Sequence, residues 1–569
     1  MSRRRRSTEL LVTRTPMIWH GWGDPTQRHG LADGAEDFLS AIIGPLDRRT
    51  PPVSLAQVQV GPSTLTGIQR AALEMAVGPE HVRDDHLTRV EHAGGKSYPD
   101  LVRRRAGDAM GAPDAVVYPR DHEEVTRLLD VAVEHRIAVV PFGGGTSVVG
   151  GVEPVRGPFT ALVALDLARM DQLLDLDEVS GIAAFQPGLR GPHAEALLAE
   201  RGFTLGHFPQ SYEYATLGGY VATRSAGQSS TGYGRIDDLV VGIRCAAPVG
   251  EIRVGHGAGS AAGPDLRALL TGSEGTLGIL TEVSLRVQPA PEVELHEAFV
   301  APSFASGAAT LRALVRAGIA PDIVRLSDAD ETRTALAQQH GWKMEVLQRL
   351  LALRGYDSPC LMILGWEGTR ASVTRRRGSV TGRLASRRIV RLGRSAGTSW
   401  ARGRFHGPYL RDELMDRGVM VETLETAASW SHLGELYLAV REALTESLAG
   451  RGTPPLVLCH ISHLYDTGAS LYFTWVAQQE PGAELEQWHA AKLAASEAIV
   501  NLGATITHHH AVGTDHRGFM EAEVGPLGLA ALRAVKAELD PTGILNPGKL
   551  VPTDDEVGRL PRHPRIQRR

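Results

Sequence analysis

A cluster of glycine and hydroxyl residues, placed directly after a short apolar run, could bind an anionic ligand. It comprises Pro141, Phe142, Gly143, Gly144, Gly145, Thr146 and Ser147. Three consecutive glycines allow successive backbone N–H groups to converge on one anion, and the two hydroxyl groups add donors. The cluster therefore predicts a diphosphate site, with a structural glycine turn as the alternative. It lacks the lysine of a P-loop and the helix entry of a Rossmann motif.

Three further loops rich in glycine and hydroxyl residues follow within the same region. They lie at residues 206–227, 233–238 and 272–281. Glycine is favoured where the backbone itself must approach a ligand closely. Together with the first cluster, these loops predict a long ligand that is enclosed by backbone groups.

Three adjacent histidines, His508, His509 and His510, could handle a proton or a phosphate. A zinc site and a structural polar turn are the alternatives. On an extended segment, His508 and His510 would point to one side and His509 to the other, so we expect at most two of them in one small site. Zinc would also need further ligands of compatible geometry. His207, near the glycine-rich loops, is expected to be a structural histidine.

The composition is that of a folded globular protein. The chain has 569 residues, a formal net charge of −5, 43% apolar and 22% charged residues. These values argue against wholesale disorder and against a non-specific nucleic-acid binder. Three separated cysteines exclude a disulfide framework and a CxxC metal site, and favour a reducing, cytoplasmic setting. No signal peptide or membrane-spanning helix is expected, because no apolar run is long enough.

Alternating apolar runs and helical periods predict the elements that carry the glycine-rich loops. Strands are expected at 115–118, 137–140, 160–165, 181–186, 239–247, 278–287 and 295–300. Helices are expected at 65–77, 123–135 and 191–201.

Residues 300–500 have the texture of an α+β domain. Helices are expected at 306–317, 329–339, 433–448 and 485–502, and strands at 360–366, 456–463 and 470–477. A helix-rich segment is expected between 507 and 541. The arginine-dense stretch 375–394 is expected to be an exposed loop or helix face, with the orientation of a phosphorylated substrate as the alternative.

Four motifs in this order resemble the FAD-binding domain of the vanillyl-alcohol oxidase/PCMH flavoprotein superfamily. They read PFGGGTS from residue 141, TLGGYVATRSAG from 216, YGRIDDLV from 233 and GSEGTLGILTEV from 272. The resemblance covers roughly residues 108–290. It implies FAD as the cofactor, and the absence of histidine from the glycine cluster favours non-covalent binding.

The resemblance also implies which residues contact FAD. Besides the seven residues of the glycine cluster, they are Gln210, Ser211, Tyr212, Glu213, Tyr214, Ala215, Thr216, Thr223, Arg224, Ser225, Ala226, Glu274, Gly275, Thr276, Leu277, Gly278, Ile279 and Leu280.

The implied fold class is α+β. A two-subdomain PCMH-type FAD-binding domain would be joined to an α+β substrate (cap) domain over the flavin, with a helical C-terminal segment. The expected divisions are an N-terminal region (1–107), the FAD-binding domain (108–290), the cap domain (291–503), a closing segment (504–552) and a basic tail (553–569).

Motifs outside the FAD-binding region resemble the alkyldihydroxyacetonephosphate synthase family. They are WHGWG from residue 19, GRF from 403, PYLRD from 408, HLYDTGASLYF from 463 and THHHAVG from 507. This family exchanges the acyl group of acyl-dihydroxyacetone phosphate for a fatty alcohol through a flavin N5 adduct. The implied partners are small, lipid-like substrates and no nucleic acid. A homodimer and a peripheral membrane contact of a cytoplasmic enzyme stay open.

The same resemblance assigns roles to residues. Tyr465 falls on the catalytic tyrosine, Arg411 on the substrate-binding arginine, and His508–His510 on the tract needed for activity. A tyrosine base has an ordinary pKa of about 10, so ionisation near neutral pH needs roughly 3–4 kcal/mol of anion stabilisation. We expect the histidine tract or Arg411 to supply it, with Asp466 and Glu425 as supporting, capping or solvated groups.

Some residues depart from the family pattern. Ala511 and Thr514 stand where glycine and lysine are usual, and the run Asn546, Pro547, Gly548 and Lys549 is more typical of related dehydrogenases. An FAD-linked oxidase or dehydrogenase of a D-2-hydroxy acid or related alcohol is therefore the alternative function. A flavin-binding protein without catalysis is a third reading, against which Tyr465, Arg411 and the histidine tract argue.

Overall fold

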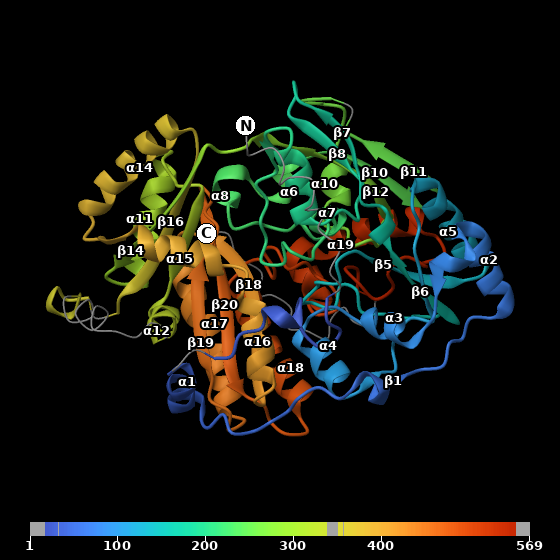
Figure 1. The fold of residues 1–569 in the computed structure, drawn as a ribbon, viewed down its shortest axis with the longest axis horizontal. Helices are drawn as coiled ribbons and strands as arrows, with labels where there is room; N and C mark the ends of the chain where they lie inside the picture. The colour runs from blue at the N-terminus through green and yellow to red at the C-terminus, as the bar shows by residue number, and fades with distance from the viewer. Residues whose placement is uncertain (1–16, 32–33, 256, 338–350, 357, 553–569) are drawn as a thin grey trace, which may run out of the picture.

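Three large sheets and two small ones organise the part of the chain that the structure describes. This computed structural model describes residues 17–31, 34–255, 257–337, 351–356 and 358–552. Helices and sheets are mixed throughout, as Figure 1 shows, so the α+β prediction is confirmed.

The first sheet has four strands and presents the glycine cluster. Its order is β2 (Val82–Arg83), β4 (Ala115–Val117), β6 (Ala161–Asp166) and β5 (Ile137–Phe142). The last three strands are parallel, and α5 (His122–Glu134) makes the crossover between β4 and β5. The glycine cluster begins within the last two residues of β5 and continues where the strand ends, so the rigid sheet fixes the start of the loop.

The second sheet has five antiparallel strands and carries the other glycine-rich loops. Its order is β11 (Gly250–Val254), β10 (Val240–Ala247), β12 (Ile279–Arg286), β8 (Ile182–Phe185) and β7 (Leu173–Asp177). Its helices are α6 (Gly191–Ala199), α7 (Leu217–Thr223), α8 (Ser230–Tyr233), α9 (Ile236–Leu239) and α10 (Leu266–Leu270). The loops therefore connect elements packed on one core.

The third sheet has seven strands and forms the core of the predicted cap region. Its order is β17 (Val390–Gly393), β14 (Val293–Ala301), β16 (Cys360–Gly368), β15 (Ile323–Ser327), β19 (Leu456–Ile461), β20 (Gly468–Gln478) and β18 (Val419–Ser429). Its helices are α11 (Phe304–Arg316), α12 (Ala329–Ala337), α14 (Arg370–Ala385), α15 (Arg394–Gly403), α16 (Gly407–Met415), α17 (Leu433–Ala449) and α18 (Glu484–Asn501). The helix expected at 329–339 forms up to Ala337, and its last residues lie outside the described ones.

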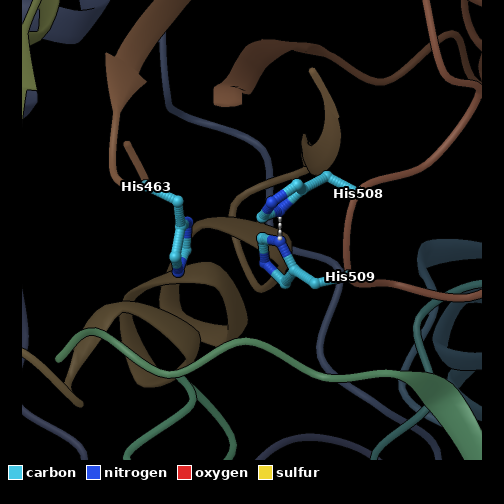
Figure 2. A group of neighbouring side chains, drawn as sticks. All are labelled: His463, His508 and His509. Carbon is cyan, nitrogen blue, oxygen red and sulfur yellow. Dashed lines mark hydrogen bonds between the residues drawn. The ribbon is translucent and has the colours of Figure 1, made fainter. Parts of the chain in front are cut away.

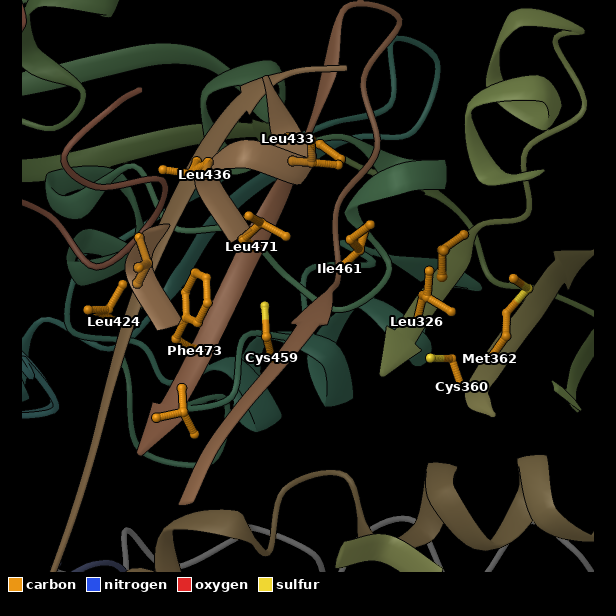
Figure 3. Packing of buried hydrophobic residues seen from close by; sticks show 14 of the residues in the cluster. Leu326, Cys360, Met362, Leu424, Leu433, Leu436, Cys459, Ile461, Leu471 and Phe473 are labelled. Carbon is orange, nitrogen blue, oxygen red and sulfur yellow. The ribbon is translucent and has the colours of Figure 1, made fainter. Parts of the chain in front are cut away.

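Buried side chains from several strands hold this sheet against its helices. Figure 3 shows Phe473 and Leu471 of β20 beside Leu433 and Leu436 of α17, with Cys459 of β19 close by. The core fixes β19 and β20, so the turn between these strands, which carries Tyr465, has rigid supports at both ends.

The remaining described elements connect or cover the sheets. They are α1 (Ala35–Ile43), α2 (Gly67–Val77), α3 (His86–Glu91), α4 (Tyr98–Arg105), α19 (Met520–Leu539), the short pairs β1 (Gln59–Val60) with β3 (Asp108–Ala109) and β9 (Phe203–Thr204) with β13 (Gln288–Pro289), and five single-turn 3₁₀ helices (Pro25–Gln27, Leu55–Gln57, Pro79–His81, Leu167–Arg169 and Arg517–Phe519). Within α19, Gly525 leaves the helical conformation just before Pro526. No helix among the described residues has the length and apolar character needed to cross a bilayer.

The arginine-dense stretch 375–394 lies mostly on a helix, α14, which matches the expected exposed helix face, but four of its arginines pair with buried carboxylates. Arg376 pairs with Asp322 at 2.7 Å, and Arg377 pairs with the fully buried Glu297 at 3.0 Å. The buried carboxylates require these partners, because an unpaired charge in the interior is costly.

Candidate active site

The phenol of Tyr465 contacts the imidazole of His508. Tyr465 lies in the turn between β19 and β20, where its backbone N–H donates to Gly468 O at 2.9 Å. Its Oη lies 2.6 Å from His508 Nε2. This is a short hydrogen bond between a candidate base and a group able to accept its proton.

Burial keeps the histidines around Tyr465 neutral. The pKa values of His508 and His509 lie well below the ordinary value, mainly because both rings are buried, and that of His510 is lowered to about 3. A neutral imidazole carries one N–H and one lone pair. His508 Nδ1 lies 2.8 Å from His509 Nδ1, so the Tyr465 hydroxyl can donate to His508 Nε2 while His508 Nδ1–H donates to His509. The arrangement can pass a proton from the phenol into the histidine tract.

Glu425 of β18 holds the backbone of the tract. Its buried carboxylate accepts hydrogen bonds from the N–H groups of His508, His509 (2.9 Å) and His510 (2.5 Å), and from the Thr507 hydroxyl at 2.8 Å. Wrapping around one carboxylate bends the segment. Among the roles considered for Glu425, capping is the one its contacts match, whereas Asp466 is exposed.

The bend makes the expectation of alternating histidines wrong. His508 and His509 face each other and lie beside His463, which follows β19 (Figure 2). Nitrogen atoms of these three rings lie within 4.8 Å of one another, a spacing that a metal ion could use. His463 Nε2 is already hydrogen-bonded to Gly227 O at 3.0 Å, and His508 Nε2 to Tyr465, so the observed contacts favour proton handling.

Arg235 is a site residue to which the sequence analysis gave no role. Burial raises the pKa of Tyr465, and the neighbouring Arg235 guanidinium, within hydrogen-bond reach, opposes that rise. Arg235 is the N-cap residue of α9 (Ile236–Leu239) and also pairs with Asp237 at 3.0 Å. The YGRIDDLV motif was the available signal, but sequence could not show that its arginine faces a tyrosine 230 positions later.

Arg411 lies apart from this cluster, on α16. Its Nη1 donates to Lys96 O at 2.7 Å, while its buried Nε and Nη2 have no hydrogen-bond partner among the described residues. Within those residues it forms no hydrogen bond or ion pair with Tyr465. The expectation that Arg411 could stabilise the phenolate is therefore not matched by a contact. Its Nε lies 3.7 Å from Asp412 Oδ1, and the donors without a hydrogen bond suit an anionic ligand.

The N-terminal WHGWG motif covers the neighbourhood of Arg411. The backbone N–H of Trp22 donates to Asp412 Oδ2 at 2.5 Å, and Lys96 Nζ donates to Ile18 O at 2.6 Å. Trp22 also packs edge-on against Tyr214, with ring centroids 5.7 Å apart. This segment thus joins α16 to the loop of residues 210–216.

The glycine cluster fits the diphosphate of FAD. None of the backbone N–H groups of residues 143–147 donates to another described residue, so these donors are available to an anion. A Cβ on Gly144 would lie 2.2 Å from Tyr214 O, and one on Gly143 would lie 2.5 Å from Thr216 Oγ1. Only glycine permits this close approach of two predicted cofactor loops.

The loop that follows residue 272 packs against the glycine cluster. This loop, the glycine cluster and the loop of residues 210–216 are together called the cofactor cradle. Gly275 abuts Pro141, with 2.2 Å between its would-be Cβ and the ring, and Glu274 N donates to Ala222 O at 3.0 Å. Asn546 Nδ2 donates to Glu274 O at 2.7 Å and to Gly151 O at 3.2 Å. The structure therefore brings the predicted loops together, and the run from Asn546 ties two of them.

Several predicted cofactor residues direct their side chains elsewhere. The Glu274 carboxylate, whose pKa burial raises to about 7, accepts from Val512 N and Gly513 N at 2.9 and 2.8 Å. Ser225 Oγ lies 2.8 Å from the buried His207, which matches the structural role expected for His207.

The other residues that were predicted to contact FAD fall into three groups by their exposure. Buried in or against cores are Phe142, Tyr214, Ala215, Thr216, Ala226, Gly275, Thr276, Leu277, Gly278, Ile279 and Leu280. Partly exposed are Pro141, Thr146, Ser147, Ser211, Tyr212 and Thr223, and exposed are Gln210, Glu213 and Arg224. Contact with FAD through their backbones stays a prediction for the buried group.

Comparisons with known proteins cover nearly the whole chain. Residues 113–255 match the family model of the FAD binding domain, and residues 290–550 match that of the C-terminal domain of FAD linked oxidases. The alkyldihydroxyacetonephosphate synthase of Dictyostelium discoideum is 34% identical over 89% of this chain and 84% of its own, and that of Trypanosoma brucei brucei is 33% identical over 86% and 81%. A solved alkyldihydroxyacetonephosphate synthase is 31% identical, with a TM-score of 0.80 over 93% of this chain and 98% of its own. These findings confirm the predicted FAD cofactor and the PCMH-type fold.

Proposed function

Because this chain belongs to the alkyldihydroxyacetonephosphate synthase family, we propose that it is an FAD-dependent transferase. It exchanges the acyl group of acyl-dihydroxyacetone phosphate for a fatty alcohol and so forms an ether-lipid precursor. The observation that carries the proposal is the 2.6 Å hydrogen bond between Tyr465 and a neutral His508 beside Arg235.

Each residue of the site has a defined task in this proposal. Bound FAD supplies an electron acceptor for the substrate carbon next to the ketone. Tyr465 removes the proton from that carbon, and His508 holds the phenol proton. Glu425 fixes the position of His508 through the backbone, and the free donors of Arg411 bind the phosphate or carboxylate.

The dehydrogenase-like run from Asn546 does not by itself favour the oxidoreductase alternative. Asn546 Nδ2 bonds to backbone oxygens of both neighbouring loops, which gives this run a structural task. The oxidoreductase reading is therefore kept as an outcome of the test.

The test offers the purified flavoprotein two kinds of substrate. Acyl-dihydroxyacetone phosphate with a long-chain alcohol should yield an ether product and a free fatty acid, detected by mass spectrometry. D-2-hydroxy acids with an electron-accepting dye should leave the dye coloured. Bleaching of the dye without ether product would replace the transferase with the oxidoreductase.

The proposal also covers the partners of the protein and its compartment. We expect small, lipid-like substrates reached from a membrane face in the cytoplasm, and a homodimer stays a prediction. The divisions at residues 107, 290, 503 and 552 likewise stay predictions.

A further inference from the structure

The stretch 368–411 concentrates positive charge in a chain whose net charge is −5. It contains many arginines and no lysine, aspartate or glutamate. The stretch folds into α14, β17, α15 and the start of α16, and Figure 1 shows α14 at one margin of the molecule with α15 nearer its centre. Most of this charge therefore belongs to one end of the seven-stranded sheet, where β17 is the edge strand.

Three of these arginines share one carboxylate. Arg377, Arg391 and Arg394 place nitrogen atoms 3.0, 2.5 and 3.6 Å from Oε1 of Glu297. The Glu297 side chain is fully buried, whereas the arginine side chains are 26%, 48% and 64% exposed. One negative charge balances only one of the three, so an excess of positive charge faces solvent.

A shallow cavity of about 400 Å³ lies beside this group. It is lined by Arg394, Ser395, Thr398, Ser399 and Arg402. These residues follow the four-residue spacing of one helical face of α15. The lining offers guanidinium and hydroxyl donors without an acidic side chain, which is the chemistry that binds phosphate oxygens.

Further exposed arginines extend the positive surface. Within the described part of the chain, the following form no ion pair: Arg370, Arg375, Arg383, Arg387, Arg388 and Arg402. Two exposed arginines of the FAD-binding region are paired instead: Arg120 with Asp121 at 3.1 Å and Arg201 with Glu178 at 3.1 Å.

We propose that this arginine face, made by the exposed arginines of α14, β17 and α15, docks on the anionic phospholipid headgroups of a bilayer. Charge complementarity argues for the occupant, because basic clusters on a surface bind anionic lipid. The choice of a bilayer also rests on the proposed function, whose substrates are lipid-like. Phe405, which follows α15, stacks on Tyr212 of the candidate cofactor loop with ring centroids 5.5 Å apart, so the arginine-bearing helix leads directly to that loop.

The experiment measures co-sedimentation of the full-length flavoprotein with vesicles. Phosphatidylcholine vesicles are compared with vesicles that also contain phosphatidylglycerol. The face variant carries Arg375→Glu, Arg383→Glu and Arg402→Glu. The control variant carries Arg120→Glu, Arg201→Glu and Arg253→Glu, which change the net charge equally on exposed residues of the FAD-binding region. Flavin absorbance and thermal melting check that both variants fold.

Wild type and control should bind the anionic vesicles, with binding weakened by salt, and the face variant should lose at least about tenfold in affinity. Equal binding by the face and control variants would overturn the proposal, because both keep the arginine-rich ends of the chain. Binding of a DNA oligonucleotide without binding of anionic vesicles would overturn it as well.

The same variants separate this inference from the proposed function. The vesicles contain no substrate, so sedimentation does not depend on catalysis. With detergent-dispersed substrates, the face variant should make ether product at the wild-type rate. Normal vesicle binding by a protein that makes no ether would reject the transferase and leave docking intact.

Discussion

Two opposing effects act on the phenol of Tyr465. Burial disfavours the phenolate and raises its pKa, while Arg235 favours the phenolate. The neutral imidazole of His508 accepts a hydrogen bond from the phenol, and taking up its proton would form an imidazolium that burial disfavours. The residue is therefore suited to transient rather than permanent ionisation.

Replacing Tyr465 with phenylalanine removes the proposed base and keeps the ring. We expect ether formation to fall at least about 100-fold, with flavin content unchanged. Product formation by mass spectrometry and flavin absorbance provide the measurements. Tyr437→Phe is the matched control, since it removes a hydroxyl bonded to Asp328 at 3.1 Å outside the site. Full activity in Tyr465→Phe would remove this residue from the role of base.

Replacing Arg235 with methionine removes the positive charge next to Tyr465. The pKa of Tyr465 should then rise further, so the limb of activity that increases with pH should shift to higher pH. Arg235→Lys keeps a cation and should restore most of the wild-type profile. The measurement is kcat against pH for the three proteins, and superimposable profiles would contradict the assignment.

At the scale of elements, the cofactor cradle depends on three loops that touch through backbone atoms. The clearest test is Gly144→Ala, whose Cβ would lie 2.2 Å from Tyr214 O. We expect the loops to separate and the variant to lose most of its flavin. Gly111→Ala is the control, because its Cβ would meet no atom within 4 Å. The measurement is the flavin content per protein. Full flavin occupancy in Gly144→Ala would contradict the proposal that close contact of these loops is needed to bind FAD.

The sequence predicted β4, β5, β6, β8, β10, β12, α5 and α6 around this cradle, because apolar periodicity reports burial on each element, but not β7, β11 or the short helices α7 to α10. It did not predict β18, whose buried Glu422 and Glu425 interrupt the apolar pattern. The sequence analysis also expected the histidine tract to be extended. It could not show the bend, because the carboxylate that causes it, Glu425, is more than 80 positions away in the chain. Contacts of this kind depend on tertiary structure, which local spacing does not encode.

At the scale of the molecule, buried histidines make stability depend on pH. Burial lowers the pKa of six neighbouring imidazoles: His207, His463, His508, His509, His510 and His516. The unfolded chain binds protons at these sites below about pH 6.5, whereas the native state does not. Their contribution is therefore complete above pH 6.5 and is lost as the pH falls towards 4.

Four buried carboxyl groups with large shifts oppose this trend. The pKa values of Glu274, Glu367 and Asp515 are raised to about 7 and that of Asp328 to about 6, so the native state gains stability from them as the pH falls below these values. The histidines outnumber them. We expect the urea concentration at the midpoint of unfolding, measured by circular dichroism, to decrease as the pH falls from 6.5 to 4.5. A constant or increasing midpoint would contradict the conclusion that the histidines outweigh the carboxyl groups.

The tie between Asn546 and Gly151 has a consequence for biosynthesis. The ribosome delivers Gly151, shortly after the glycine cluster, 395 residues before the asparagine that bonds to it. The cradle therefore closes only after Asn546 has been synthesised, and until then the amides of the glycine cluster stay exposed to solvent. We therefore expect cofactor capture to be a late, post-translational event, and ribosome-bound chains that stop short of Asn546 should emerge without the yellow colour of the mature enzyme.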